Sequence, residues 1–368
     1  MKFSISRDAL LKPLNLVAGV VERRQTLPIL SNVLLSLDGE QLALTGTDLE
    51  VELIGRIALD EAGDSGEITV PARKLADICK SLPDASRLDF TLEDQRVQLR
   101  SGRSRFTLST LPAAEFPSID QAAGSLEFSV RQGQLKRLIE KTAFSMAQQD
   151  VRYYLNGMLF EATPKHLRTV ATDGHRLAMA TIEDGITGIS GDSQVILPRK
   201  GVLELLRLLQ DADADIRIVI GSNHFRAVTD EFTFTSKLVD GKFPDYERVL
   251  PRGATRHMTG VRGELKDALS RTAILSNEKY RGVRLIVEKD SLDILANNPE
   301  QEEAEETVSV DYAGERIEIG FNVGYLIDVL SVLGGEEVRF SLTDGSSSVL
   351  IEEPENDGAV YVVMPMRL

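Results

Sequence analysis

The chain has 368 residues, 42% of them hydrophobic and 27% charged, and a formal net charge of −15. Its length exceeds that of an ordinary single core and predicts two or three domains, and no stretch approaches the ~18 apolar residues of a membrane helix. The chain has a single cysteine, Cys79, which excludes an internal disulfide framework and is typical of the reducing cytoplasm. Its four histidines do not have the spacing of zinc ligands. We therefore expect a cytoplasmic protein with no metal, no other cofactor and no membrane partner.

The predicted helices recur along the chain in a fixed pattern. "RDALLKPL" (7–14), "RQGQLKRLI" (131–139) and "RGELKDAL" (262–269) have helical character. "VPARKLADICKSL" (70–82) and "LPRKGVLELLRLL" (197–209) each place a proline and an Arg-Lys pair at the start of an apolar helix, and "FNVGYLIDVLSVL" (321–333) keeps only the apolar stripe. Apolar residues recur at helical spacing in these three segments: Leu75, Ile78 and Leu82; Val202, Leu205 and Leu209; Leu326, Val329 and Leu333.

Between the helices the sequence alternates apolar and polar residues across polar turns. Residues 88–99, 284–296 and 338–351 show this pattern, which is typical of half-buried hairpins. Many hairpins with few helices favour antiparallel α+β domains over a parallel sheet.

One strand-end signature occurs three times, as "LTGTDLEVEL" (44–53), "VATDGHRLA" (170–178) and "ILANNPEQEE" (294–303). Asp48, Asp173 and Asn298 are separated by 125 residues each time. An internal repeat of this length predicts three similar domains, spanning residues 1–125, 126–253 and 254–368.

Positive charge is concentrated in the helical segments of this acidic chain. Residues 7–24, 71–82, 131–141, 199–210, 262–271 and 322–334 together carry a net charge of +9, so the remainder carries −24. Helix propensity does not explain the sign, because helices favour Glu as much as Lys and Arg. The positive charge of the helical segments is explained if these helices form a surface that binds a polyanion. No base-reading motif accompanies these helices, so we expect salt-sensitive contact with phosphates that is independent of base sequence.

Long runs across the whole chain resemble the bacterial sliding clamp, the beta subunit of DNA polymerase III. They include "TLPILSNVLL" (26–35), "RSRFTLSTLPAAEFP" (103–117), "FSMAQQDVRYYLNGMLFE" (144–161), "SKLVDGKFPDY" (236–246) and "YVVMPMRL" (361–368). The resemblance implies an α+β fold of three similar clamp domains, each with antiparallel sheets and two helices. It further implies a head-to-tail homodimer that closes into a six-domain ring around duplex DNA, as a processivity factor.

Two sets of surface residues are expected to serve this ring. The DNA-binding set is Arg24, Arg73, Gln149, Tyr153, Tyr154, Arg199 and Lys200. A head-to-tail interface needs two different patches on each subunit. We expect one patch, basic and apolar, at Lys74, Arg103, Arg105, Phe106 and Leu108, and the other at Ile274, Leu275 and the acidic run Glu300, Glu302, Glu303, Glu305 and Glu306.

The resemblance also implies a hydrophobic pocket that binds short linear peptides. Its residues would be Leu155, Thr172, Gly174, His175, Arg176, Leu177, Pro244, Arg248, Val249, Tyr280, Asn322, Tyr325, Ser346, Ser348, Val362, Met364, Pro365, Met366, Arg367 and Leu368. Apolar walls with a few polar groups suit a peptide anchor. The implied partners are the catalytic subunit of the replicative polymerase, the clamp-loader complex, translesion and repair polymerases, and mismatch-repair and ligase-type proteins.

"VATDGHRLA" taken alone would also suit a catalytic site. A hydrolase that uses Asp173 and His175 is therefore the alternative function. Against it, the counterparts of Asp173-Gly-His-Arg are Asp48-Leu-Glu-Val and Asn298-Pro-Glu-Gln, so the turn persists while the chemistry does not. The sequence also lacks a phosphate-binding P-loop. We therefore predict a non-enzymatic protein in which Asp173 and Gly174 form a turn.

Overall fold

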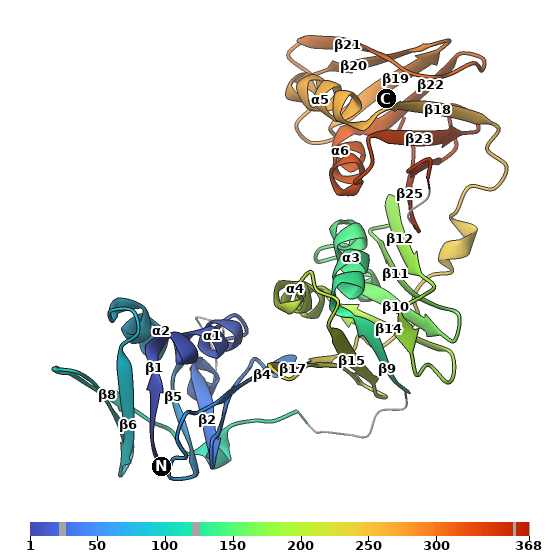
Figure 1. The fold of residues 1–368 in the computed structure, drawn as a ribbon. Coiled ribbons are helices and arrows are strands. Elements are labelled where there is room, and N and C mark those ends of the chain that lie inside the picture. Colours follow the sequence, from blue (N-terminus) through green and yellow to red (C-terminus); the bar gives the residue numbers. More distant parts are fainter. Residues whose placement is uncertain (22–26, 120–125, 356–357, 368) are drawn as a thin grey trace. The chain divides into compact units, whose positions relative to one another are not determined.

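The structure is a computed structural model that describes residues 1–21, 27–119, 126–355 and 358–367. Contacts between residues divide the chain into two compact units, coloured along the sequence in Figure 1. Unit 1 comprises Met1–Gly133, Thr187–Ile189 and Leu203–Leu238, and unit 2 comprises Gln134–Ile186, Ser190–Val202 and Val239–Leu368.

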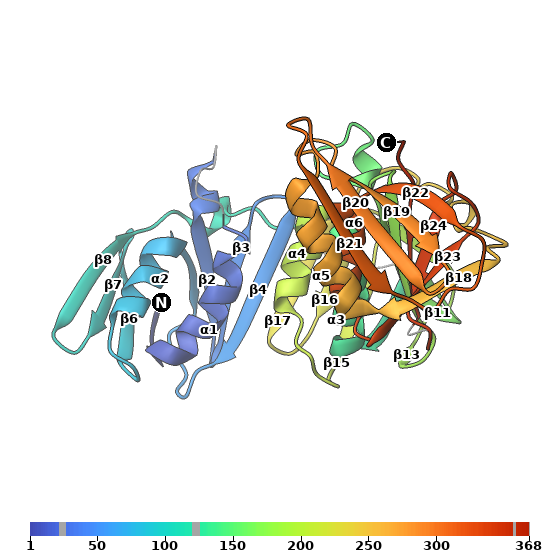
Figure 2. The same ribbon diagram turned by 90° about the horizontal axis from the view of Figure 1, so that it is seen from above.

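Unit 1 is built on two sheets. The four-stranded sheet has the order β1 (Lys2–Ser6), β6 (Arg87–Glu93), β7 (Arg96–Ser101) and β8 (Ser104–Ser109). The nine-stranded sheet has the order β13 (Ile186–Thr187), β9 (Leu126–Arg131), β15 (Asp215–Ile220), β16 (His224–Val228), β17 (Phe232–Lys237), β4 (Val51–Ala58), β3 (Gln41–Thr47), β2 (Asn32–Asp38) and β5 (Gly66–Pro71). Helices α1 (Arg7–Ala18) and α2 (Ala72–Ser81) lie side by side in this unit (Figure 2).

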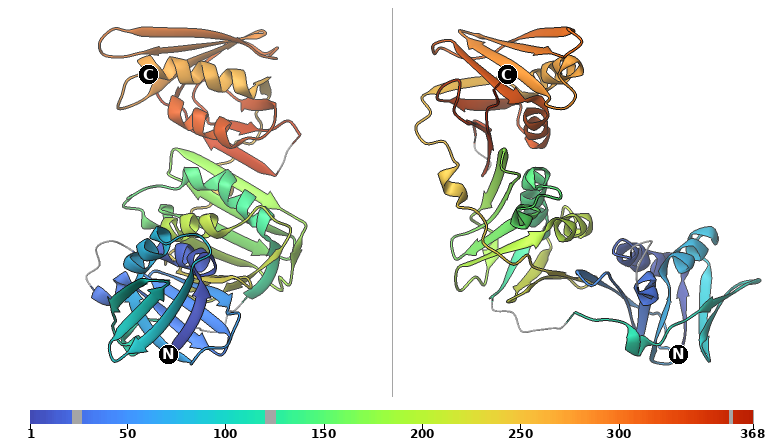
Figure 3. Two further views of the ribbon diagram at one scale, coloured as in Figure 1. Left: turned by 60° about the vertical axis from the view of Figure 1, so that its left-hand side comes forward. Right: turned by 180° about the vertical axis from the view of Figure 1, so that it is seen from behind.

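Unit 2 also contains two sheets. The eight-stranded sheet has the order β14 (Ser193–Pro198), β10 (Gly157–Thr163), β11 (His166–Thr172), β12 (Arg176–Ile182), β25 (Ala359–Val363), β24 (Val349–Glu352), β23 (Glu337–Leu342) and β18 (Arg256–Val261). The four-stranded sheet has the order β21 (Glu303–Ser309), β20 (Ser291–Asn297), β19 (Gly282–Glu288) and β22 (Ile317–Asn322). Helices α5 (Arg262–Thr272) and α6 (Val323–Val332) lie side by side (Figure 3), while α3 (Gln132–Thr142) and α4 (Arg199–Leu208) each contain a boundary between the units.

Every α-helix in the described part of the chain begins at the residue directly after a strand. The pairs are β1 and α1, β5 and α2, β9 and α3, β14 and α4, β18 and α5, and β22 and α6. These helices confirm the six predicted segments, although α1 ends at Ala18, short of the predicted basic segment that runs to residue 24. The predicted apolar positions are buried except Ile78, which is half-buried, and Leu82, Leu209 and Leu333 lie one residue beyond the ends of α2, α4 and α6.

The three predicted hairpins are also confirmed. They correspond to β6 and β7, β19 and β20, and β23 and β24, each paired antiparallel. With antiparallel ladders and helices at strand ends, the fold is α+β as predicted.

The repeated strand-end signature is a side-chain-stabilised turn. β3, β11 and β20 end one residue before Asp48, Asp173 and Asn298 respectively. Asp48 Oδ1 accepts hydrogen bonds from the backbone N–H groups of residues 50 and 51, and Asp173 Oδ1 accepts them from residues 175 and 176. Asn298 Oδ1 accepts one from residue 302. The repeat therefore preserves a turn, because Asp and Asn side chains can bond to the backbone two or more residues ahead.

Candidate functional site

A small apolar cavity of about 150 Å³ lies beside the Asp173 turn in unit 2. The C-terminal tail runs next to the turn, since the backbone N–H of Met364 donates to the carbonyl of His175 at 2.9 Å. The cavity is lined by Arg152, Tyr154, Leu155, Thr172, Gly174, Arg176, Leu177, Pro244, Tyr246, Val249, Val362 and Met364. Aliphatic, proline and aromatic walls with a few polar groups are typical of a site for an apolar side chain.

Much of the predicted pocket set lines this cavity: Leu155, Thr172, Gly174, Arg176, Leu177, Pro244, Val249, Val362 and Met364. Of the described residues, the rest of the set lies outside the lining: His175, Arg248, Tyr280, Asn322, Tyr325, Ser346, Ser348, Pro365, Met366 and Arg367. Leu368 falls outside the described residues. His175 is exposed on the turn, and Tyr325 adjoins the lining through Arg176, whose guanidinium carbon lies 4.5 Å from the centre of its ring.

Three lining residues were not predicted for the pocket, namely Arg152, Tyr154 and Tyr246. Tyr154 was expected at DNA but packs against the apolar cluster beneath the cavity. Tyr246 lies in the segment after β17, where Phe243, Pro244 and Tyr246 are apolar or aromatic residues between charged ones. That local pattern is the signal that could have indicated a buried linker.

The turn itself is held by Arg152. Its Nη2 donates to the carbonyl of Asp173 at 3.3 Å, and its guanidinium pairs with Asp150 at 2.9 Å. The hydrogen bond from Arg152 lowers the pKa of Asp150 to about 2. Gly174 has a φ of 89°, and a Cβ there would lie 2.9 Å from Arg152 Nη2. The positive φ therefore favours glycine at this position, and any larger residue would also displace the Arg152 guanidinium.

The carboxylate of Asp173 is fully engaged in structural contacts. Its Oδ1 accepts two backbone N–H groups, and its Oδ2 accepts Arg176 Nε at 3.0 Å. A general acid–base pair would need this carboxylate to orient His175, whose imidazole instead lies exposed to solvent. The arrangement therefore builds a rigid turn beside a cavity.

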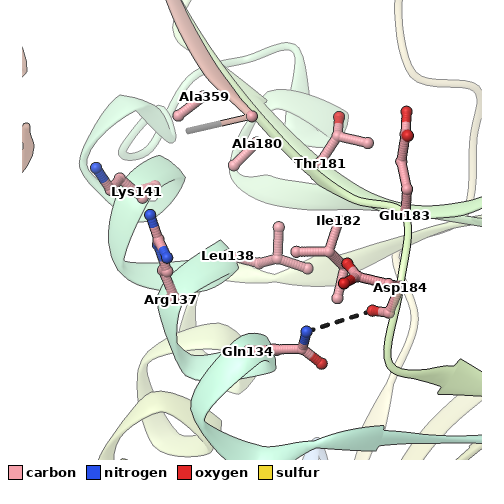
Figure 4. Close-up of a pocket in the computed structure, with 11 residues that line it drawn as sticks. Gln134, Arg137, Leu138, Lys141, Ala180, Thr181, Ile182, Glu183, Asp184 and Ala359 are labelled. Atoms are coloured by element: carbon pink, nitrogen blue, oxygen red, sulfur yellow. Dashed lines mark hydrogen bonds between the residues drawn. The ribbon is translucent and has the colours of Figure 1, made fainter. Parts of the chain in front are cut away.

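A larger hollow of about 450 Å³ lies between α3 and the end of β12 (Figure 4). Arg137 and Lys141 project from α3 on one side, and Glu183 and Asp184 follow β12 on the other. Gln134 Nε2 donates to the carbonyl of Asp184 at 3.3 Å across its end. Charges of both signs at the rim suit neither an apolar anchor nor a polyanion, so the smaller cavity is the better candidate despite its size.

The structure places the residues predicted for DNA in different settings. Arg73 is exposed on α2, and Gln149 and Tyr153 are exposed in the loop before β10, Tyr153 by 56%. Arg199 is half-buried at the start of α4 and donates to the carbonyl of Met146 at 3.5 Å. Burial is the main cause that lowers the pKa of Arg199, and repulsion from Arg176 lowers it further. Lys200 is half-buried. Arg24 falls outside the described residues.

Several of the residues predicted for the subunit interface lie at two open sheet edges, whereas Lys74 lies on α2 and Ile274 and Leu275 directly follow α5. β8 is an edge strand in unit 1, with Arg105 exposed on it and Arg103 exposed in the turn just before it. β21 is an edge strand in unit 2, with Glu303 and Glu305 exposed. Lys74, Glu300 and Glu302 are exposed and Phe106 and Leu275 are half-buried, while Ile274 is 76% exposed.

Two of the predicted interface residues are used within their own unit. Leu108 is buried at 6% exposure in the core of its sheet. Glu306 accepts Arg271 Nε at 2.6 Å, and this hydrogen bond lowers the pKa of the carboxyl. Leu108 therefore offers little surface to another subunit, and the charge of Glu306 is largely balanced before any contact forms.

Within the described residues, no group of three or more His, Cys, Asp or Glu side chains is arranged to hold a metal ion. No described helix is long and apolar enough to cross a membrane.

Three repeats of one α+β domain, with helices at strand ends and a small apolar cavity beside the repeated turn, define a clamp-type protein. Residues 1–120, 129–245 and 247–367 match, in order, the N-terminal, central and C-terminal domains of the DNA polymerase III beta subunit. The chain belongs to this family, the beta sliding clamps.

Individual relatives agree over the full length. The chain is 63% identical to the beta sliding clamp of Pseudomonas aeruginosa and 56% identical to that of Escherichia coli K12, with 100% of each chain covered. It superposes on the P. aeruginosa crystal structure with a TM-score of 0.97 over 100% of both chains, at 63% identity. A P. aeruginosa structure with the same TM-score and a Bartonella birtlesii structure, at 38% identity and TM-score 0.95, both contain griselimycin and are fully covered.

Membership of this family confirms the predicted function. The protein is the non-catalytic processivity factor of a replicative DNA polymerase, and the hydrolase alternative is wrong. Clamps of this family bind DNA, form ring dimers and bind polymerase and other proteins through a peptide pocket.

Proposed function

We propose that the cavity beside the Asp173 turn is the site where this protein binds its partner peptides. The observation that carries the proposal is the convergence of Leu155, Leu177 and Val362 with the tail residue Met364 around one apolar cavity. Methionine adapts to different ligands, so one such site can serve several partners. The partners are the polymerase catalytic subunit, the clamp loader, translesion and repair polymerases, and mismatch-repair and ligase-type proteins.

The predicted residues outside the cavity extend this site along the surface. Tyr280 is 57% exposed, and Asn322 Nδ2 donates to its carbonyl at 3.4 Å. An extended peptide would place one apolar side chain in the cavity and its next residues against the rest of the predicted set. Of that set, His175, Arg248, Ser346 and Arg367 are exposed and Tyr325, Ser348, Pro365 and Met366 are half-buried, while Leu368 lies outside the described residues.

Truncation of the tail tests the proposal. Deletion of residues 364–368 should abolish binding of griselimycin and of polymerase-derived peptides, measured by titration calorimetry, while sedimentation still shows a dimer. Met364 lies at a chain end that the buried cores do not need. His175→Ala should weaken the same ligands only modestly, because His175 lies beside the cavity and not in its lining. Unchanged affinity in the truncated protein would refute the pocket.

We propose that the basic helices and the loop before β10 form the DNA-binding surface, with Arg73, Gln149 and Tyr153 as direct contacts. Their exposure supports this role. Arg24, Tyr154, Arg199 and Lys200 complete the proposed set. For Arg199 the bond to the Met146 carbonyl favours a role in holding the DNA-facing loop.

We propose that β8 of one subunit meets β21 of another in the head-to-tail dimer. Open sheet edges can add a strand from a second chain. The exposed cations Arg103 and Arg105 on one edge match the exposed anions Glu303 and Glu305 on the other. Ile274 and Leu275 would supply apolar contact with Phe106, and Lys74, Glu300, Glu302, Glu306 and Leu108 would lie at the margin.

We infer domain boundaries of 1–125, 126–253 and 254–368 and a cytoplasmic location. The 125-residue repeat supports the boundaries. The role in DNA replication and the single buried cysteine support the location.

A further inference from the structure

The segment that links the central and C-terminal thirds packs on one face of the eight-stranded sheet. Phe243 and Tyr246 are buried there against an apolar cluster that includes Leu159 and Val170. These two sheet residues face each other across β10 and β11. One step along the same face, Glu161 lies opposite Arg168 on one side and Gln194 on the other. The face under the linker thus changes from an apolar row to a polar row.

The Tyr246 side chain spans both rows. Its ring packs on the apolar cluster, and its hydroxyl lies 3.1 and 3.2 Å from the two carboxylate oxygens of Glu161. Arg168 Nη1 donates to the same hydroxyl at 2.9 Å. Glu161 also bonds His166 Nε2 at 2.8 Å and accepts Gln194 Nε2 at 2.5 Å. A carboxylate at 8% exposure is therefore surrounded by donors.

The Glu161 group remains charged at neutral pH. Burial alone would raise the pKa of Glu161, but hydrogen bonds from His166, Gln194 and Tyr246 and the charge of Arg168 together lower it. A charged acceptor makes stronger hydrogen bonds than a neutral one. The polar row therefore holds the Tyr246 hydroxyl firmly.

The linker supplies three residues of the cavity lining, Pro244, Tyr246 and Val249. Pro244 and Val249 line the cavity on either side of Tyr246 in sequence, and the backbone N–H of Val249 donates to the Tyr246 carbonyl at 3.0 Å. Glu161 is not among the lining residues. We propose that Glu161 is a positioning residue for peptide binding, which acts through the Tyr246 hydroxyl to hold the Pro244 and Val249 walls in place before the ligand arrives.

This inference rests on the proposed function of the cavity and explains how its walls are preorganised. A site that is only partly formed binds with an affinity reduced by its formed fraction. Loss of the Glu161 to Tyr246 bond by Glu161→Gln should therefore weaken ligands, although Glu161 lies outside the cavity lining. The same loss should have no effect on ligand affinity if the polar row merely stabilises the sheet.

The test measures griselimycin affinity by calorimetry on the full-length dimer for Glu161→Gln, Tyr246→Phe and the double variant. Each single change should weaken binding by about three- to tenfold, because a neutral amide or a missing hydroxyl lowers the formed fraction of the wall. The double variant should bind griselimycin with about the same affinity as whichever single variant binds it less tightly. Both changes break the same hydrogen bond between Glu161 and Tyr246, so their effects should not add.

A matched control separates this effect from general loss of stability. Tyr312 is buried at 1% exposure, and its hydroxyl donates to the carbonyl of Glu315 at 2.6 Å outside the cavity lining. Tyr312→Phe removes the same atom and should change griselimycin affinity by less than about twofold, as expected for a site that does not share partners with the pocket.

The outcomes distinguish the two proposals. Glu161→Gln with unchanged affinity, or losses that multiply in the double variant, would overturn the positioning role. If Glu161→Gln leaves affinity unchanged while the 364–368 deletion abolishes binding in the same assay, only the positioning role falls and the cavity remains the peptide site. If the deletion also leaves affinity unchanged, the cavity is not the peptide site and both proposals fall.

Discussion

Arg176 and Asp328 form an ion pair, with Nη1 2.5 Å from Oδ2, that joins β12 in the central third of the chain to α6 in the C-terminal third. Arg176 also donates to Asp173 at 3.0 Å and to the carbonyl of Phe144 at 2.9 Å. The guanidinium lies over the ring of Tyr325 as well. One side chain therefore ties together the turn, the start of β12 and the neighbouring helix.

The exposure of the two partners differs, and this predicts unequal costs of substitution. The Arg176 side chain is 12% exposed, whereas that of Asp328 is 48% exposed. Arg176→Lys keeps the charge but loses the planar fork, so it should lower the free energy of unfolding by about 1–3 kcal/mol. Asp328→Asn should cost less than about 1 kcal/mol, as for other solvent-exposed pairs. Denaturant titration checks both, and equal losses would contradict the central role of Arg176.

The proposed dimer edge predicts that loss of apolar contact at Ile274 yields folded monomers. Ile274→Ala with Leu275→Ala removes surface that is open in the single chain, and burial of one such isoleucine contributes roughly 1.5–3 kcal/mol to association. Sedimentation velocity over a dilution series should show the dimer dissociating at higher concentrations than wild type. Leu203→Ala, on α4 and also exposed, is the size-matched control and should leave the dimer unchanged. An undisturbed dimer in the double variant would remove Ile274 and Leu275 from the interface.

The repeated elements of this fold were predictable because the signal is local. Leu326 and Val329 lie one helical turn apart and are buried, as their spacing predicts. The Asp173 turn was predictable because Asp48 and Asn298 keep the same side-chain function while their neighbours change. Comparison within one chain thus separated a structural aspartate from a catalytic one.

The cavity was predictable only in part, because its walls come from distant segments. Leu177 and Val362 followed from the family resemblance, but Tyr246 depends on where a linker without regular strands settles on the sheet. Glu161 lies two residues after Leu159 in β10, so the sequence predicts only that the two side chains share one face of the strand. Whether that face is covered depends on tertiary packing, and no local period encodes it.

Burial of Cys79 predicts a thiol that does not react in the folded protein. Cys79 has 0% exposure on α2, and burial raises the pKa of its thiol to about 11, although the charge of Arg7 opposes this shift. The thiolate is the reactive form, so iodoacetamide at pH 8 should label the native protein very slowly and the denatured protein readily. Mass spectrometry gives the labelled fraction.

The raised pKa also predicts a pH dependence of stability. Because the folded state holds the thiol proton more tightly, the contribution of Cys79 is complete below the thiol's ordinary pKa and is lost as pH rises toward about 11. Cys79→Ala should remove this alkaline loss and all labelling in denaturant. Native labelling at the rate of a free thiol would show that the site opens or is not buried.

The concentration of positive charge on the helices predicts that charge reversal at Arg73 on α2 weakens DNA binding. The same charge reversal at an exposed cation outside the helices should not. Arg73 is exposed on α2, so Arg73→Glu should cost little stability. If Arg73 contacts a phosphate, its loss should lower the slope of log affinity against log salt by about 0.9 for each contact removed, in addition to reducing retention on DNA at low salt.

Lys165→Glu makes the same charge change in the exposed turn between β10 and β11 and is the control. Binding to duplex DNA measured by fluorescence anisotropy across a salt series should separate the two variants. Equal loss in both would mean that net charge alone governs binding, and the proposed surface on the helices would have to be abandoned.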